Sequence, residues 1–165
     1  MKGRETNVTI LMADDDEDDS VLVREALAES QLPIELYIVG NGEELMDYLY
    51  HRGRYADNSS KPHPGLILLD LNMPKKGGLE ALKEIKTDPQ LRQIPVVMLS
   101  TSSAQEDIYN TYDLGANSFI IKPVTFTLLV EVMKTLGKYW FEIVQLPAEA
   151  MGDKHGQQPH QSSVR

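Results

Sequence analysis

The residues best suited to chemistry are acids, a hydroxyl and a lysine, and each follows an apolar run. Six consecutive acids occupy residues 14–19, Asp70 follows residues 66–69, and two further runs precede Ser100 and Lys122. Neighbouring carboxylates repel one another, and a hard divalent cation with oxygen ligands relieves that repulsion. The pattern therefore predicts a cation site, with Asp14 and Asp15 as its first candidates because they come directly after an apolar segment.

Each of these residues also has a less specific interpretation. Most charge runs form solvated surface, and residues 17–19 fit that description, since negative charge favours the first turn of a helix. A lysine such as Lys122 often extends along apolar surface into solvent, but Pro123 fixes the turn after it. Neither Ser100 nor Asp70 would indicate a site alone, so the prediction depends on the combination.

A fold must position these residues, and the chain alternates apolar runs with amphipathic stretches, as βα units around a parallel sheet do. Strands are predicted at residues 8–13, 35–39, 66–69, 95–99 and 119–121. Helices are predicted at residues 20–30, around residues 45–49, around 79–85, at 105–114 and from near residue 125. Residues 51–64, rich in glycine, serine and proline, are predicted to form an exposed loop. The alternation predicts a doubly wound α/β fold.

Such a fold would bring the polar residues together. Ligands of an open α/β sheet bind beyond the carboxyl ends of the strands, where the strand order reverses. Asp14 and Asp15 end the first predicted strand, Asp70 the third, Ser100 the fourth and Lys122 the fifth. We therefore expect these five side chains on one rim of the sheet.

Composition excludes several classes of function. The 165 residues carry a formal net charge of −9 and contain no cysteine. The negative charge argues against direct binding to nucleic acid, and the lack of cysteine excludes disulfides and thiolate chemistry. No apolar run approaches the roughly 20 residues of a membrane span, and residues 1–6 do not form a signal peptide. We expect a cytoplasmic protein that binds neither nucleic acid nor membrane.

Four stretches of the sequence resemble the receiver domains of two-component signalling. They are ILMADD at 10–15, DLNMPKKGG at 70–78, residues 94–100, and residues 115–123. The resemblance spans about residues 6–137 and implies a flavodoxin-like, five-stranded parallel sheet of order 2-1-3-4-5 with five helices. It also implies a signalling phosphoacceptor rather than an enzyme, with a sensor histidine kinase as its partner.

Carried over residue by residue, the resemblance makes Asp70 the phosphoacceptor. Mg²⁺ would be held by Asp14, Asp15, Asp70 and the backbone carbonyl of Asn72. This assignment fits the chemistry, because phosphoryl transfer depends on positioning and on neutralising charge on the phosphoryl oxygens, with a carboxylate as nucleophile.

The resemblance also assigns the residues that would respond to the phosphoryl group. Lys122 would pair with one phosphoryl oxygen, Ser100 would hydrogen-bond another, and Phe119 would be the aromatic switch that turns inward. Phe119 stands where most receivers have tyrosine, so a hydroxyl contact with a partner is lost. The peptide bond between Lys122 and Pro123 is expected to be cis, as in the family.

The C-terminal region predicts an interface. Residues 137–147, with the long 51–64 loop, look like the small response regulators paired with bacterial and cyanobacterial phytochromes. Beyond the usual end of a receiver, this extension adds more apolar surface than one small core covers, which is typical of an interface. We expect a homodimer through the last helix and Tyr139, Trp140, Phe141, Val144 and Leu146, the alternative being that the extension folds back on its own domain. The domain would cover residues 6–147, and residues 148–165 would be a disordered tail.

Three other functions remain as alternatives. A magnesium phosphohydrolase would use the Asp14–Asp16 pair, but Asp18 stands where its motif has threonine or valine. An FMN carrier needs a Ser/Thr/Gly-rich phosphate loop where this chain has acids. A receiver-like binding module that works without phosphorylation usually lacks one of the acids or the lysine, and this chain retains them all.

Overall fold

The apolar runs form a parallel sheet whose central strands are buried on both faces. The computed structural model describes residues 8–57 and 62–147. Its strands are β1 (Val8–Ala13), β2 (Ile34–Val39), β3 (Leu66–Leu69), β4 (Val96–Ser100) and β5 (Ser118–Ile121). They pair in parallel in the order β2-β1-β3-β4-β5, which confirms the predicted topology and places the reversal of strand order between β1 and β3.

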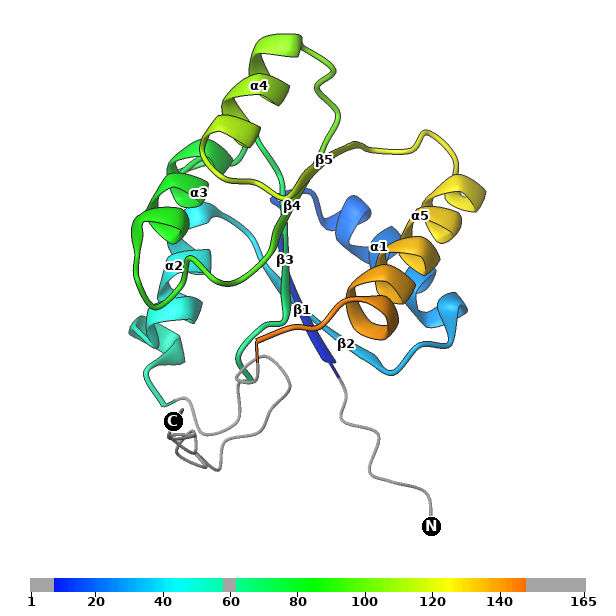
Figure 1. The fold of residues 1–165 in the computed structure, drawn as a ribbon, viewed down its shortest axis with the longest axis horizontal. Coiled ribbons are helices and arrows are strands. Elements are labelled where there is room, and N and C mark those ends of the chain that lie inside the picture. The colour runs from blue at the N-terminus through cyan, green and yellow to red at the C-terminus, as the bar shows by residue number, and fades with distance from the viewer. Residues whose placement is uncertain (1–7, 58–61, 148–165) are drawn as a thin grey trace, which may run out of the picture.

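Helices cover both faces of the sheet (Figure 1). They are α1 (Glu17–Ser30), α2 (Gly42–Tyr50), α3 (Gly78–Thr87), α4 (Gln105–Asp113) and α5 (Phe126–Lys138). In Figure 1, α1 and α5 lie on one side of the sheet, and α2 and α3 lie on the other with α4 next to α3. Two short turns complete the described chain, the 3-10 turn η1 (Gly53–Tyr55) and the π-helical turn η2 (Tyr139–Ile143).

Alternating residues of the strands divide the core into two layers. Leu11 and Leu69 face α2 and α3, whereas Met12 and Leu68 face α1 and α5. All four side chains are almost completely buried, as expected for strands covered on both faces. The sheet is therefore held from both sides, and its carboxyl edge is a rigid support for the residues that follow each strand.

The first helix begins earlier than the sequence predicted. The prediction began at residue 20, but α1 begins at Glu17 because Asp16 caps it. The Asp16 carboxylate accepts hydrogen bonds from the backbone N–H groups of Asp18 at 2.9 Å and Asp19 at 3.3 Å. Such a cap satisfies N–H groups that have no partner within the helix. The acids 17–19 therefore form the first turn of α1. The ends of the strands, of α4 and of α5 differ from prediction by about one residue at most, whereas α2 begins at Gly42 and α3 ends at Thr87, beyond the residues that marked them.

The described residues of the predicted exposed loop at 51–64 include the 3-10 turn η1, which has one buried side chain. Tyr55 of η1 is buried, and its hydroxyl donates to the Glu44 carboxylate at 2.8 Å. Arg54 and the backbone N–H of Gly40 also donate to Glu44. Burial alone would raise the pKa of Glu44, but these hydrogen bonds lower it below the usual value. Tyr48 anchors the far side of the loop by donating to the carbonyl of Pro62.

The chain after α5 turns back across its own domain. Trp140 and Phe141 pack partly buried against the layer of α1 and α5. Phe141 and Leu146 also lie close to Gly65, at the start of β3. The predicted disordered tail at 148–165 lies outside the described residues. None of the described helices has the length and apolar character needed to cross a bilayer.

Candidate acidic site at the carboxyl edge of the sheet

Three carboxylates meet where the strand order reverses. Asp14 follows β1, Asp70 follows β3, and ligand oxygens of Asp14, Asp15 and Asp70 all lie within 4.8 Å of one another. The Asp14 side chain is fully buried and that of Asp70 is 10% exposed, whereas Asp15 faces solvent. The predicted convergence of these acids is confirmed by this geometry.

Backbone hydrogen bonds orient the two buried carboxylates. One oxygen of Asp14, Oδ1, accepts from the N–H of Asp16 at 2.9 Å, and Oδ1 of Asp70 accepts from the N–H of Leu71 at 2.8 Å. The backbone N–H of Asp70 donates to the carbonyl of Ala13, which ties the end of β3 to β1. Each buried acid therefore keeps its second oxygen, Oδ2, for the lysine across the site.

Lys122, the residue after β5, enters the site from the opposite side. Its Nζ lies 3.0 Å from Asp14 Oδ2, 3.5 Å from Asp70 Oδ2 and 2.7 Å from Asp19 Oδ2. The side chain is 13% exposed. The contact with Asp19 is the shortest of the three, and sequence reasoning had assigned that residue only to the charge of the first helical turn. The sequence feature that could have identified Asp19 is the helix cap at Asp16. This cap decides where α1 starts and therefore which side chain of its first turn faces the sheet.

Burial and charge shift the pKa values of the buried groups. Burial raises the pKa of Asp70 to about 6, with Lys122 opposing the shift and Asp14 adding to it. Burial likewise raises the pKa of Asp14. Burial alone would lower the pKa of Lys122, but its hydrogen bonds to Asp19 and Asp14 raise it above the usual value. One ammonium thus faces several carboxylates, an excess of negative charge that a hard divalent cation would offset.

Glycine at position 78 lets α3 approach the end of β3. A Cβ there would lie 2.2 Å from the carbonyl oxygen of Asp70 and 2.8 Å from Leu71 Cα. The N–H of Gly78 donates to the Leu71 carbonyl at 2.9 Å. Asn72 lies exposed in the loop between β3 and α3. The close approach of α3 thus sets the course of the loop that begins at Asp70.

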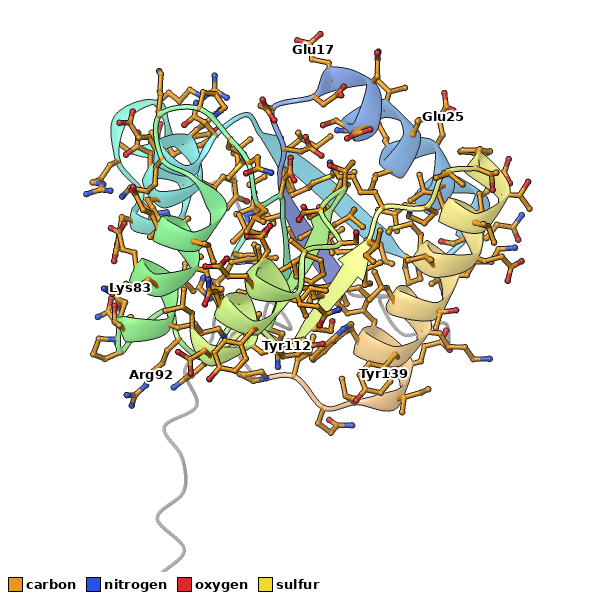
Figure 2. All side chains as sticks on the ribbon, turned by 90° about the horizontal axis from the view of Figure 1, so that it is seen from above. Glu17, Glu25, Lys83, Arg92, Tyr112 and Tyr139 are labelled. Atoms are coloured by element: carbon orange, nitrogen blue, oxygen red, sulfur yellow. The ribbon has the colours of Figure 1, made fainter. Side chains whose placement is uncertain are left out.

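Ser100 ends β4, the strand next to β3, and Phe119 lies on β5, the strand beyond β4. Ser100 is fully buried at the end of β4, and its Oγ accepts from the N–H of Ser102 at 3.2 Å. Phe119 pairs with Met98 across β4 and β5 and packs partly buried against the layer of α2 and α3. Its N–H donates to the hydroxyl of Tyr112 at 3.2 Å, and Figure 2 shows Tyr112 extending from α4.

The peptide bond between Lys122 and Pro123 is not cis, so that expectation from the family is wrong for this structure. The two isomers of a bond preceding proline differ by only about 0.5–1 kcal/mol, so local sequence does not decide between them. Lys122 nevertheless reaches the acids, and its N–H donates to the carbonyl of Ser100 at 2.8 Å. That backbone bond extends the pairing of β4 and β5 and aims Lys122 into the site.

A parallel sheet of this strand order, with its acids and lysine on one rim, is the architecture of a phosphoacceptor domain. The family described as the response regulator receiver domain matches residues 10–134. The chain belongs to this family and is a receiver domain of two-component signalling.

The chain matches several relatives over nearly their whole length. Response regulator Rcp1 of Synechocystis is 42% identical over 139 residues, which cover 84% of this chain and 92% of Rcp1. The crystal structure of the phosphorylated cyanobacterial phytochrome response regulator RcpA matches with a TM-score of 0.79 and 44% identity, covering 86% of this chain and 99% of that one. The Mn²⁺-bound form of Rcp1 matches with a TM-score of 0.77 and 40% identity, over 86% of this chain and 99% of that one.

Proposed function

We propose that Asp70 accepts a phosphoryl group from a phosphohistidine of a sensor histidine kinase. The observation that carries this proposal is the arrangement of the Asp70 carboxylate. Its Oδ1 is held by the N–H of Leu71, and its Oδ2 lies 3.5 Å from the Lys122 ammonium. A nucleophile in a constant orientation, next to a cation, is what phosphoryl transfer needs.

The residues present suit a hard divalent cation. Asp14, Asp15 and Asp70 would hold Mg²⁺, joined by the backbone carbonyl of Asn72. Carboxylate and carbonyl oxygens are the ligands that Mg²⁺ prefers, and the excess of carboxylates over ammonium groups supports its binding. When bound, the ion supplies positive charge against the oxygens of the transferred phosphoryl group. The Mn²⁺-bound form of the relative Rcp1 supports a divalent ion in this family.

The chain's own residues then carry the transfer. A carboxylate oxygen of Asp70 forms a bond to phosphorus while the phosphorus–nitrogen bond of the donor breaks and the imidazole keeps that electron pair. Lys122 pairs with a phosphoryl oxygen and the Ser100 hydroxyl donates to another. The only reactions proposed for this chain are its own phosphorylation and the later loss of the phosphoryl group to water.

Phosphorylation would be read out at the surface of α4 and β5. Drawing the buried Ser100 hydroxyl to the phosphoryl group vacates space beside Phe119, whose ring would turn inward. The Phe119 N–H donates a hydrogen bond to the Tyr112 hydroxyl, which links β5 to α4 beside the proposed switch residue. The added charge thereby biases two arrangements of one surface, and partners distinguish them.

We propose a phytochrome as the sensor kinase and the cytoplasm as the compartment. RcpA is described as a cyanobacterial phytochrome response regulator, and a 34% identical relative from R. palustris as acting in red light signalling. The negative net charge supports binding to proteins rather than to nucleic acid.

We also propose a homodimer through the last helix and the extension after it. An open groove of about 600 Å³ lies between β5 and α5, lined by Ile120, Val132, Leu136, Tyr139 and Trp140 among others. Tyr139 and Trp140 would form the centre of the interface, with Val144 at its edge. Phe141 and Leu146 lie near Gly65 of their own domain and would hold the extension against that domain.

Intact-mass measurement tests the phosphoacceptor. The protein is incubated with Mg²⁺ and acetyl phosphate, beside Asp70→Asn and an EDTA control. We expect one added phosphoryl group that requires Mg²⁺ and is absent from Asp70→Asn. A folded wild-type chain that gains no mass would contradict the proposal and favour a binding module that works without phosphorylation.

Sedimentation equilibrium tests the dimer. Trp140→Ala should shift the wild-type chain towards monomer, because it removes a large apolar contact from the proposed interface. Val124→Ala is the control, since Val124 is 94% exposed and lies outside the groove. A wild-type chain that is monomeric at every concentration would contradict the dimer.

For the kinase, transfer from a purified phytochrome kinase should be faster than from unrelated sensor kinases.

A further inference from the structure

The lysine of the site is shared between carboxylates with different roles. Two partners of Lys122, Asp14 and Asp70, belong to the group of acids that suits a metal ion. Both face the lysine ammonium through Oδ2. The third partner, Asp19, lies outside that group yet makes the shortest contact, 2.7 Å. The lysine is therefore held most closely by the one acid of the three that a cation does not need.

The backbone builds Asp19 into this position. The Asp14 carboxylate accepts from the N–H of Asp16, and the Asp16 carboxylate in turn accepts from the N–H of Asp19. These two links connect the end of β1 to the first turn of α1. The neighbouring acids do not share this placement, since Asp18 is exposed and Glu17 points away from the domain (Figure 2). Asp19 is half-buried and faces Lys122.

We infer that Asp19 is a positioning residue that holds the Lys122 ammonium and so keeps Asp14 and Asp70 available to a divalent cation. The inference rests on the proposed metal site. An ammonium and a metal ion that share the same carboxylate oxygens compete for them and repel each other. Asp19 gives the lysine a carboxylate that the cation does not use. Without Asp19, the carboxylate partners left to Lys122 among the described residues are the two that the cation needs.

Titration of the full chain with Mn²⁺ tests the inference, with free Mn²⁺ followed by its electron paramagnetic resonance signal. Asp19→Asn is expected to weaken Mn²⁺ binding about two- to fivefold more than Asp18→Asn, the range expected of a partly exposed ion pair. Asp18→Asn is the matched control because it removes the same charge one residue away. Asp19→Glu should restore most of the affinity. Equal affinities of Asp19→Asn and Asp18→Asn would overturn the inference.

A double-mutant cycle separates the role of Asp19 from a direct attraction to the ion. In a Lys122→Gln background there is no ammonium to hold, so Asp19→Asn should change Mn²⁺ affinity no more than Asp18→Asn does. A full effect of Asp19→Asn in that background would overturn the inference, because Asp19 would then act on the cation itself. Failure of the proposed function looks different, since the wild-type chain would then bind no Mn²⁺ and gain no phosphoryl mass, and the inference would fall with it.

Discussion

Replacing Gly78 with alanine tests how closely α3 must approach the phosphoacceptor. The new Cβ would lie 2.2 Å from the Asp70 carbonyl oxygen and 2.8 Å from Leu71 Cα. Ordinary contacts between such atoms are about 3.5–4.0 Å, so the backbone must separate by roughly 1 Å. Both atoms belong to the main chain, and no side-chain rotation relieves the contact. The displacement acts directly on the segment that carries Asp70.

The expected cost follows from this overpacking. Forcing an extra methyl group into a packed site costs about 1–3 kcal/mol, which for a chain of this size lowers the melting temperature by about 2–12 °C. Displacing a reacting group by about 1 Å can slow a reaction up to about 100-fold, so we expect phosphorylation of Gly78→Ala by acetyl phosphate to slow at least tenfold.

Gly77→Ala is the matched control. Gly77 has a φ of −76°, and the nearest atom to its Cβ, apart from its chain neighbours, is the Leu71 carbonyl oxygen at 3.8 Å. Its stability should change by only about 0.5 kcal/mol. Thermal unfolding by circular dichroism and the rate of mass gain would be measured for both variants. If Gly78→Ala matched Gly77→Ala in melting temperature and phosphorylation rate, the reasoning from this contact would be refuted.

Three further predictions concern the rest of the fold. Met133→Ala empties a fully buried position and should cost about 2–5 kcal/mol in urea unfolding, and a loss as small as that of exposed Val124→Ala would contradict this. Tyr112→Phe removes the acceptor of the Phe119 N–H and should cost about 0.5–1.5 kcal/mol by the same measurement, whereas no loss would mean that water replaces the hydroxyl without penalty. Hydrogen bonds hold the folded-state pKa of Glu44 below its usual 4.5 despite burial. The unfolded chain therefore binds more protons than the folded chain near this pH. The stability that the Glu44 carboxylate supplies is present above pH 4.5 and is lost as the pH falls through the folded-state pKa. Unfolding free energy should therefore drop more steeply on acidification in the wild type than in Glu44→Gln, and parallel curves would contradict the assignment.

Sequence alone predicted the sheet and the main residues of its rim. The strands are short apolar runs, and a run buried on both faces is visible locally without any knowledge of its neighbours. Because parallel strands place their carboxyl ends on one edge, the positions of Asp14, Asp70 and Lys122 after such runs were enough to bring them together. The 3-10 turn at Gly53–Tyr55 was missed because the hydrogen bond between Tyr55 and Glu44 joins two segments that are separate in the sequence, and neither local pattern indicates the other.

What the sequence by itself determined is the order of the elements and the type of chemistry on the rim, since both follow from local periodicity and from residue types at strand ends. Only the tertiary structure decided which carboxylate holds the lysine. Asp19 and Lys122 are 103 residues apart, and their contact depends on the Asp16 cap that starts α1 and on the pairing that aims the residue after β5. A shift of about 1 Å in the start of α1 or in the end of β5 would change which carboxylate lies closest to Lys122. Coulomb energies and hydrogen bonds depend on such distances, and no local sequence pattern records them.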